Sequence, residues 1–267
     1  MPDKGEVVIR EEPTMQLRDE ADQDKMLITA WSTSASAEIA GALARCPFDT
    51  VTIDMQHGAH SEATAFDSAK AIFAAGKPAI LRIPVGRNDL ASRGLDMGFE
   101  AVIAPMINSV ADADAFAKAM KYPPMGERSW GPTKALQMHS SHSPESYFRA
   151  ANRETIALAM IETREAFAAL DGILENDGID GIFVGPSDLS ISWFNGAGVD
   201  PRNAELQAVI AEIGRRTREA GKFAAIFAVD PADVPGFAKM GYRMAALNTD
   251  PGIFDAGAAV MLDKARG

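Results

Sequence analysis

Residues 156–162 read IALAMIE, and residues 181–188 read GIFVGPSD. Each stretch begins as a short apolar run typical of a buried strand and ends in a carboxylate where the chain turns, at Glu162 and at Asp188. In a chain that repeats strand and helix, the carboxyl ends of successive parallel strands lie on one face. Two carboxylates there can bind one divalent cation and leave most of its coordination sphere open. These stretches indicate a metal-assisted enzyme.

The same rhythm runs along most of the chain. From Met26 onward, short apolar runs alternate with alanine-rich amphipathic stretches such as Glu62–Ala75, Val110–Met120 and Ala204–Ala220. The predicted strands lie near residues 27–31, 49–54, 79–83, 101–105, 156–161, 180–184, 223–227 and 243–247. Eight strand–helix units close a barrel, so the predicted fold class is α/β, a (β/α)8 TIM barrel.

The length of the chain, 267 residues, fits a single barrel, because such barrels commonly form one domain of about 250 residues. Residues 1–25 are mostly polar or charged, so we predict an N-terminal extension there and one catalytic domain over residues 26–267. The longest interruption of the pattern runs from Tyr122 to about Ser143. We predict an irregular connection there, of a kind that is usually functional or mobile.

The composition favours small-molecule partners. The chain has 37 acidic and 26 basic residues, a net charge of −11, and no cluster of Lys and Arg that would suit nucleic acid or an anionic membrane. A single cysteine, Cys46, excludes an intrachain disulfide framework. No apolar run resembles a signal peptide or a membrane span, so a cytoplasmic location is expected.

Three further polar residues follow the second and third predicted strands. Asp54 and His57 follow the second, and Arg82 ends the third. If all the units form, these residues lie at the same rim as Glu162 and Asp188. Each residue alone has a structural explanation, such as capping a helix or neutralising a carboxylate. Asp54, His57 and Arg82, together with Glu162 and Asp188, supply a base, a fixed cation and two metal ligands.

These residue types suit the chemistry of a 2-oxo acid. Oxygen ligands without cysteine favour Mg²⁺ or Mn²⁺ over zinc. The amides of Ser187 and Asp188, where a helix is predicted to begin, can bind a substrate carboxylate. A cation that polarises the 2-oxo group acidifies the neighbouring C3 proton. His57, oriented by Asp54 or acting through a metal-bound water, is the available base, and Arg82 suits the developing enolate oxygen.

A Schiff-base mechanism would instead require a lysine at the end of a strand, inside the barrel. No lysine falls within a predicted strand. Lys77, Lys121, Lys134 and Lys222 all lie at strand starts or in loops. The metal-dependent route is therefore favoured.

Several motifs resemble those of the HpcH/HpaI family of class II, metal-dependent pyruvate aldolases, typified by 4-hydroxy-2-oxoheptanedioate aldolase. In chain order they are Phe48-Asp49, Asp54–Gly58, Leu81–Pro84, Gly98-Phe99 with Ala104–Met106, Tyr122–Arg128, Ile161–Thr163 and Gly178–Ser190. The resemblance covers roughly residues 26–265. It implies a TIM barrel of the pyruvate/phosphoenolpyruvate-binding type.

The resemblance also implies an activity and roles for the residues at the rim. Glu162 and Asp188 would be ligands of Mg²⁺ or Mn²⁺, with Co²⁺ as a further candidate. Arg82 would contact the metal-bound pyruvate enolate, and Asp54 with His57 would move the proton through metal-bound water. The implied reaction is reversible cleavage of a 4-hydroxy-2-oxo acid to pyruvate and an aldehyde, whose identity the sequence leaves open.

Two more properties follow from the resemblance. The amides of Ser187 and Asp188 would bind the pyruvate carboxylate. The chain would form a homo-oligomer, a trimer of dimers that exchange the last helix, here about Asp250–Arg266. One position departs from the family pattern, because Met160 stands where the family has a glutamine that contacts pyruvate. A thioether cannot donate that hydrogen bond.

Alternatives remain for the reaction and for some residues. The same enolate chemistry would serve a citrate-lyase-like acyl-CoA lyase or an oxaloacetate decarboxylase, and a non-catalytic barrel could bind an oxo acid. Glu127 and Arg128 either close over the site or pin the long connection. Trp31 either lines the rim or fills the barrel top, and core packing is the expectation. His139 and His142 could bind a metal, although a Ser-rich loop offers little scaffold.

Overall fold

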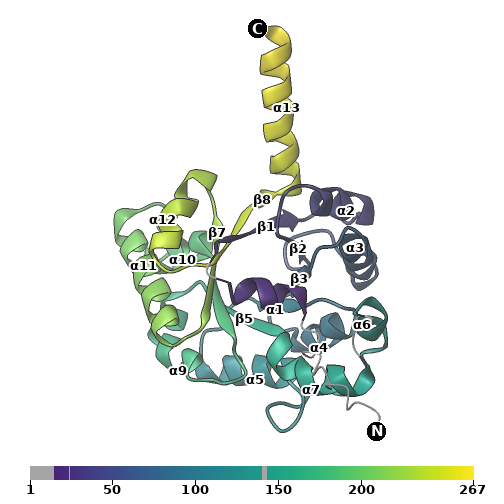
Figure 1. Ribbon diagram of the computed structural model, residues 1–267. Coiled ribbons are helices and arrows are strands. Elements are labelled where there is room, and N and C mark those ends of the chain that lie inside the picture. The colour runs from purple at the N-terminus through teal and green to yellow at the C-terminus, as the bar shows by residue number, and fades with distance from the viewer. Residues whose placement is uncertain (1–14, 24, 140–142) are drawn as a thin grey trace, which may run out of the picture.

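The computed structural model describes residues 15–23, 25–139 and 143–267. Its centre is a closed barrel of eight parallel strands that follow one another in chain order, β1 to β8, which confirms the predicted fold (Figure 1). The strands are β1 Leu27–Ser32, β2 Thr50–Asp54, β3 Ala79–Arg82, β4 Ala101–Ala104, β5 Ile156–Ile161, β6 Gly181–Val184, β7 Phe223–Ala228 and β8 Met244–Thr249.

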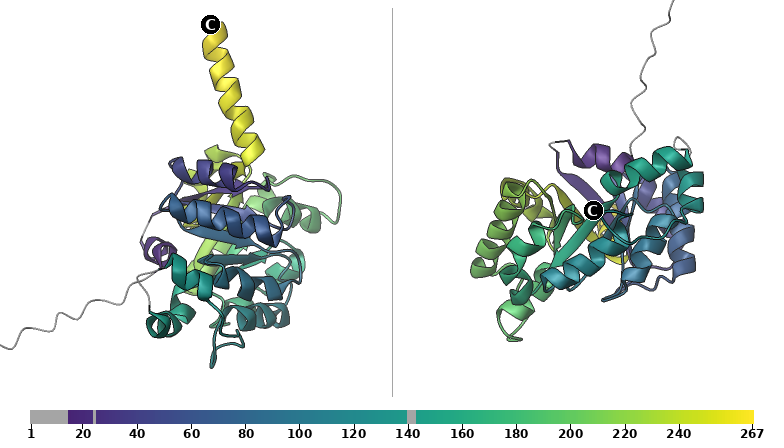
Figure 2. Two further views of the ribbon diagram at one scale, coloured as in Figure 1. Left: turned by 90° about the vertical axis from the view of Figure 1, so that its right-hand side faces the viewer. Right: turned by 90° about the horizontal axis from the view of Figure 1, so that it is seen from below.

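Most helices surround the barrel on its outer side, whereas the first lies at one end and the last projects from it (Figures 1 and 2). In chain order the helices are α1 Gln16–Ala21, α2 Ala37–Arg45, α3 Glu62–Ala74, α4 Asn88–Asp96, α5 Val110–Met120, α6 Thr133–Met138, α7 Pro144–Glu154, α8 Arg164–Ala168, α9 Leu170–Leu174, α10 Pro186–Trp193, α11 Ala204–Glu219, the 3₁₀ turn η1 Pro231–Asp233, α12 Val234–Lys239 and α13 Asp250–Arg266. The connection after Tyr122 is less irregular than its sequence predicts, because α6 forms within it.

Local sequence signals explain where many of the helices begin. Ser61 precedes α3 and forms a capping box with Thr64, in which each side chain accepts a hydrogen bond from the other residue's backbone amide. Ser36 and Ser109 cap α2 and α5 with one such bond each. These caps fix the points at which the chain leaves a strand and enters the next helix.

The strands divide their side chains between two apolar layers. Ile156, Leu158 and Met160 of β5 lie in the cluster that fills the barrel, and the residues between them pack against the surrounding helices. This alternation follows from the pleat of a strand. It continues one step beyond β5, so Glu162 also faces inward at the carboxyl end of the barrel.

Helix α1 closes the opposite, amino-terminal end of the barrel. Leu17 and Ala21 belong to the cluster that fills the barrel, and both are buried. The backbone amide of Leu17 donates to Oε2 of Glu100 at 2.7 Å, and that of Met15 donates to Oε2 of Glu154 at 3.0 Å. Part of the segment predicted to be an extension is therefore a buried plug, and residues 1–14 lie outside the described residues.

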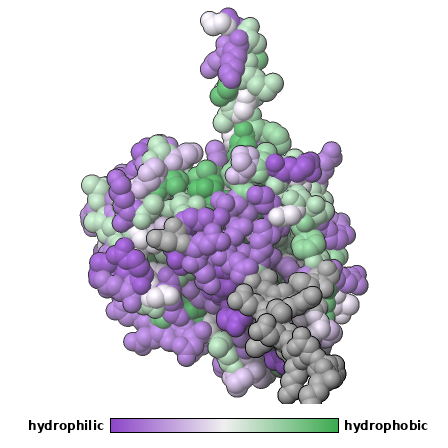
Figure 3. Space-filling view, in the orientation of Figure 1, coloured by the Kyte–Doolittle hydropathy of each residue, from purple (hydrophilic) through white to green (hydrophobic). Residues whose placement is uncertain are grey.

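Helix α13 projects away from the barrel (Figures 1 and 2). Of its residues only Asp250 is buried, where its carboxylate accepts hydrogen bonds from the backbone amides of Thr33 and Ser34, both at 2.9 Å, and from the Thr33 hydroxyl. Apolar residues are exposed along the helix (Figure 3), namely Phe254, Val260, Met261 and Leu262. Among the described helices, none is both long enough and apolar enough to cross a bilayer.

Candidate active site

Side chains from seven strands meet at the carboxyl end of the barrel. They border a cavity of about 210 Å³. The strand residues that line it are Trp31, Asp54, Arg82, Met160, Phe183, Phe227 and Thr249. The remaining lining residues are Thr33, His57, Gly185, Pro186, Ser187 and Asp188. The lining therefore combines several polar groups with apolar and aromatic side chains, as in many small-molecule sites.

Asp54 and Arg82 form the most strongly connected pair in this cavity. They are register partners on β2 and β3. Nε of Arg82 donates to Oδ1 of Asp54 at 2.9 Å, and a terminal nitrogen donates to Oδ2 at 2.6 Å. Trp31 donates its indole N–H to Oδ2 at 3.2 Å, and its ring lies 4.8 Å from the guanidinium carbon of Arg82. This two-point pairing holds the guanidinium in a fixed plane.

The contacts of Asp54 also determine its charge. Burial alone would raise its pKa, but the hydrogen bonds and positive charge of Arg82 lower the pKa below its ordinary value. Asp54 therefore stays ionised at neutral pH. Its Oδ1 accepts from the backbone amides of Gln56 and His57, at 2.9 and 3.2 Å. Asp54 thus fixes the backbone of the turn that carries the exposed His57 side chain to the cavity.

Glu162 is a buried carboxylate beside the cavity. Its Oε1 accepts the backbone amide of Met106 at 2.8 Å, and its exposed fraction is 2 %. Burial raises the pKa of Glu162 to about 7, the negative charge of Asp188 adds to that rise, and the Met106 amide and Arg82 oppose it. With this raised pKa, Glu162 is partly protonated near neutral pH, and an additional positive charge nearby would favour its ionised form.

Asp188 stands in the first turn of α10, where the chain leaves β6 through Gly185 and Pro186. A Cβ atom on Gly185 would lie 2.6 Å from Oε2 of Glu162 and 3.1 Å from the methyl group of Met160. A glycine at this position therefore leaves room for the Glu162 carboxylate beside the start of α10. Within the described ranges, no group of three or more His, Cys, Asp or Glu side chains could hold a metal, so a cation here would have few protein ligands.

The structure brings the predicted rim residues together. Asp54, His57, Arg82, Ser187 and Asp188 line one cavity, and Glu162 lies against Gly185 in its wall. Their catalytic roles stay predictions.

Several lining residues were not predicted. Trp31 is buried as expected, yet it also lines the cavity and donates to Asp54. Thr33, Phe183, Phe227 and Thr249 were not singled out at all. The signal that finds the aromatic residues is strand alternation, because each stands on the inward face near the carboxyl end of its strand.

Other candidate residues lie elsewhere. Arg128 pins the long connection, since it donates to Asp96 at 2.7 Å and stacks over Tyr122, and Glu127 pairs with Lys118. His139 is buried at the amino-terminal end of the barrel. His142 lies outside the described residues.

The lysines of the described chain also lie away from the cavity. Lys121 is buried near the start of β5, where its ammonium group donates to Asp180 at 2.7 Å and to the carbonyl of Thr155 at the same distance. No lysine is among the residues that line the candidate active site. A Schiff-base mechanism would require a lysine at this cavity.

The fold and the cavity define a (β/α)8 enzyme with its site at the carboxyl ends of the strands. The family model described as HpcH/HpaI aldolase/citrate lyase matches residues 27–255, and the chain belongs to this family. It is a carbon–carbon lyase.

Individual relatives are similar over most of their length. A hydroxypyruvate/pyruvate aldolase of Rhizorhabdus wittichii is 38% identical over 200 residues, which cover 75% of this chain and 78% of that protein. A 2-keto-3-deoxy-L-rhamnonate aldolase of Klebsiella pneumoniae is 34% identical, with 84% and 82% covered. The crystal structure of an HpcH/HpaI aldolase/citrate lyase family protein from Burkholderia cenocepacia matches with a TM-score of 0.83 at 26% identity, covering 94% of this chain and 99% of that one.

Proposed function

We propose that this enzyme cleaves a 4-hydroxy-2-oxo acid to pyruvate and an aldehyde, and catalyses the reverse addition. The observation that carries the proposal is the pair of carboxylates, Glu162 and Asp188, placed at one cavity with the fixed guanidinium of Arg82. The names of the relatives, a hydroxypyruvate/pyruvate aldolase and a 2-keto-3-deoxy-L-rhamnonate aldolase, support a small oxo acid as the substrate.

The donor set fits a hard divalent cation. Glu162 is buried, its pKa is raised to about 7, and it is repelled by Asp188, so a cation between the two would relieve an unfavourable arrangement. Carboxylate oxygens without cysteine favour Mg²⁺ or Mn²⁺, with Co²⁺ as a further candidate. When bound, such a cation supplies Lewis-acid polarisation of the oxo group.

The residues of the chain account for the remaining steps. In the cleavage direction His57 accepts the proton of the C4 hydroxyl, the C3–C4 bond breaks, and its electron pair moves into the enolate of pyruvate as the aldehyde leaves. Arg82, held in plane by Asp54, stabilises the negative oxygen of that enolate. The enolate then takes a proton at C3 from protonated His57, which regenerates the neutral base. The amides of Ser187 and Asp188 at the start of α10 bind the substrate carboxylate.

The active form is proposed to be a homo-oligomer, a trimer of dimers in which α13 packs on a second copy of the chain. In a single chain this helix leaves four large apolar side chains exposed, Phe254, Val260, Met261 and Leu262. Exposed apolar residues gathered on one projecting element are typical of an interface.

The test is exchange of the methyl protons of pyruvate in D₂O, followed by NMR with and without Mg²⁺ or Mn²⁺. The parent protein should show metal-dependent exchange, and His57→Ala and Arg82→Ala should reduce it by about 10²-fold or more. Full exchange after chelation would contradict the metal, and exchange unaffected by either substitution would contradict the site. Tight pyruvate binding without exchange would favour a binding protein, and activity only on acyl-CoA esters or oxaloacetate would favour the related lyases or decarboxylases.

A further inference from the structure

A second polar cavity, of about 390 Å³, lies at the amino-terminal end of the barrel, opposite the candidate active site. Three of its lining residues directly precede strands: Met26 before β1, Lys222 before β7 and Arg243 before β8. The other lining residues are Lys25, Arg218, Gly221, Ala238, Gly241 and Tyr242. Its volume is in the range that holds a small molecule.

The charged residues lining this cavity are all cationic. They are Lys25, Arg218, Lys222 and Arg243, and among the residues that the structure describes no acidic one lines it. This concentration of positive charge runs against the composition of the chain, whose net charge is −11. The two lysines have partners. Lys25 lies 3.8 Å from Glu20 and 3.6 Å from Asp49, and Lys222 donates to the carbonyls of Asn176 and Ile179.

The two arginines differ from the lysines. Across the described part of the chain, neither Arg218 nor Arg243 has a carboxylate within ion-pair distance. The guanidinium of Arg243 lies 5.4 Å from the ring centroid of Phe223. Arg218 runs past Gly241, where an added Cβ would lie 3.4 Å from one of its terminal nitrogens. Two guanidinium groups thus face one cavity, and no carboxylate of the described residues pairs with either of them.

The backbone keeps this cavity open. Gly221 and Gly241 both have positive φ, +70° and +99°, in the turns before β7 and β8. Residues with a side chain rarely adopt this conformation. Nothing lies within 4 Å of the position a Cβ would take on Gly221.

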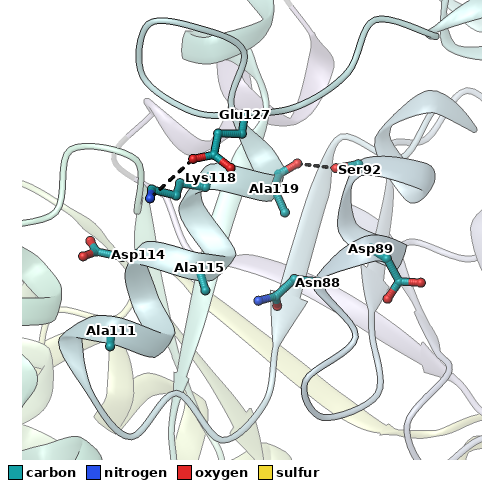
Figure 4. A pocket seen from close by; sticks show the side chains of 9 residues that line it. All are labelled: Asn88, Asp89, Ser92, Ala111, Asp114, Ala115, Lys118, Ala119 and Glu127. Atoms are coloured by element: carbon teal, nitrogen blue, oxygen red, sulfur yellow. Dashed lines mark hydrogen bonds and ion pairs between the residues drawn. The ribbon is translucent and has the colours of Figure 1, made fainter.

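The charged residues of a larger groove elsewhere offer a comparison with this cavity. The groove between α4 and α5 has a volume of about 530 Å³, and its charged residues are Asp89, Asp114, Lys118 and Glu127 (Figure 4). Each of these has a partner: Arg87 for Asp89, Asn176 for Asp114, and Lys118 with Glu127. The charged residues of that groove are of both signs, unlike those of the cationic cavity.

We propose that the cationic cavity binds a small anion that carries two or more phosphate charges, such as the diphosphate or triphosphate group of a nucleotide or free polyphosphate. Guanidinium groups bind phosphate oxygens through paired hydrogen bonds, and two of them can bridge adjacent phosphates. Lys25 and Lys222 add positive charge at longer range. The site lies at the opposite end of the barrel from the proposed catalytic residues, so its occupancy does not depend on the proposed function.

Titration calorimetry of the full-length protein, in EDTA and at constant ionic strength, tests this proposal. The probes are pyrophosphate, ATP, AMP and citrate. We expect saturable binding of pyrophosphate or ATP, and binding of AMP at least tenfold weaker. Tight pyrophosphate binding would identify the polyphosphate group as sufficient, and binding of ATP alone would show that the nucleoside is also recognised.

Two substitutions locate the site. Arg218→Gln and Arg243→Gln should each weaken binding at least tenfold. Arg215→Gln is the control, because it removes the same charge from α11, the helix that carries Arg218, but Arg215 lies outside the cavity and pairs with Glu212 and Glu219. Thermal unfolding checks that each variant is folded. The proposal is overturned if the parent protein shows no saturable binding, if citrate binds as tightly as pyrophosphate, or if Arg215→Gln weakens binding as much as the other two.

Discussion

At the scale of single residues, a glycine leaves room for the Glu162 carboxylate. Gly185 separates β6 from α10, and its missing side chain leaves room for Oε2 of Glu162 and the methyl group of Met160. Any side chain here must displace the Glu162 carboxylate or move α10. The geometry of the proposed cation site therefore depends on a residue that contributes no ligand.

Gly185→Ala is expected to weaken Mn²⁺ binding by about tenfold or more, because its Cβ would lie 2.6 Å from the Glu162 carboxylate. Titration calorimetry with Mn²⁺ measures the change. Gly198→Ala is the control, since nothing lies within 4 Å of the Cβ it adds. Equal Mn²⁺ affinity in the parent and both variants would show that Glu162 is not a ligand or that α10 adjusts freely.

At the scale of elements, helix α1 is held at the barrel end by a buried carboxylate. Burial raises the pKa of Glu100 to about 7, although the Leu17 amide opposes the rise. The folded protein therefore holds this proton more tightly than the unfolded chain, whose pKa is near the ordinary value of 4.5. The contribution of protonated Glu100 to the free energy of unfolding is therefore complete below pH 4.5, and it is lost as the pH rises to about 7.

Denaturant unfolding of the parent protein and of Glu100→Gln between pH 4.5 and 8 tests this dependence. The free energy of unfolding of the parent should fall relative to that of the variant by up to about 3 kcal/mol across this range. Other groups titrate in both proteins, so the difference between the two curves isolates Glu100. Parallel curves would mean that Glu100 ionises at its ordinary pH despite its burial.

The elements differ in how well the sequence predicts them. The eight strands were predicted to within one or two residues, because buried parallel strands are continuous apolar runs between helices. Helices α1 and α6 were not predicted. Each has only six residues, too few for a clear periodicity, and α1 depends on contacts with Glu100 and Glu154, which are distant in the sequence.

The residues of the candidate active site also differ in how well the sequence predicts them. Glu162, Asp188, Arg82 and Asp54 could be located because a polar residue at the end of an apolar strand is conspicuous. Phe227 could not, because an aromatic side chain in a strand looks the same whether it fills the barrel or lines a cavity. Only the closed barrel, with its alternation known on every strand, separates these cases.

At the scale of the whole molecule, the unpartnered helix α13 should control assembly. We expect Phe254→Glu combined with Met261→Glu to reduce the oligomer measured by sedimentation velocity, because both side chains are exposed in the single chain, at 58% and 73%. Thermal unfolding of the barrel should change little in any species that remains folded. Val199→Glu, at a loop residue that is 62% exposed, is the control. An unchanged sedimentation coefficient would contradict an interface on this helix.

The carboxylate of Asp250 joins that helix to the catalytic cavity. It accepts three hydrogen bonds from Thr33 and Ser34, and Thr33 lines the cavity. The backbone carbonyl of Thr33 in turn accepts the amide of Ala59, two residues after His57. A movement of the first turn of α13 would therefore be transmitted to the turn that carries His57, the proposed catalytic base.

We therefore expect the specific activity of this enzyme to depend on protein concentration. Packing of the helix on a second copy would fix the Thr33 loop, so specific activity should fall on dilution through the dissociation range. By reciprocity, pyruvate should shift that range to lower protein concentration. Asp250→Ala should uncouple the two effects, leaving a dilution curve that pyruvate does not move. Substrate and neighbouring subunit would then act as ligands of one another's sites, with the first turn of a single helix as the link between them.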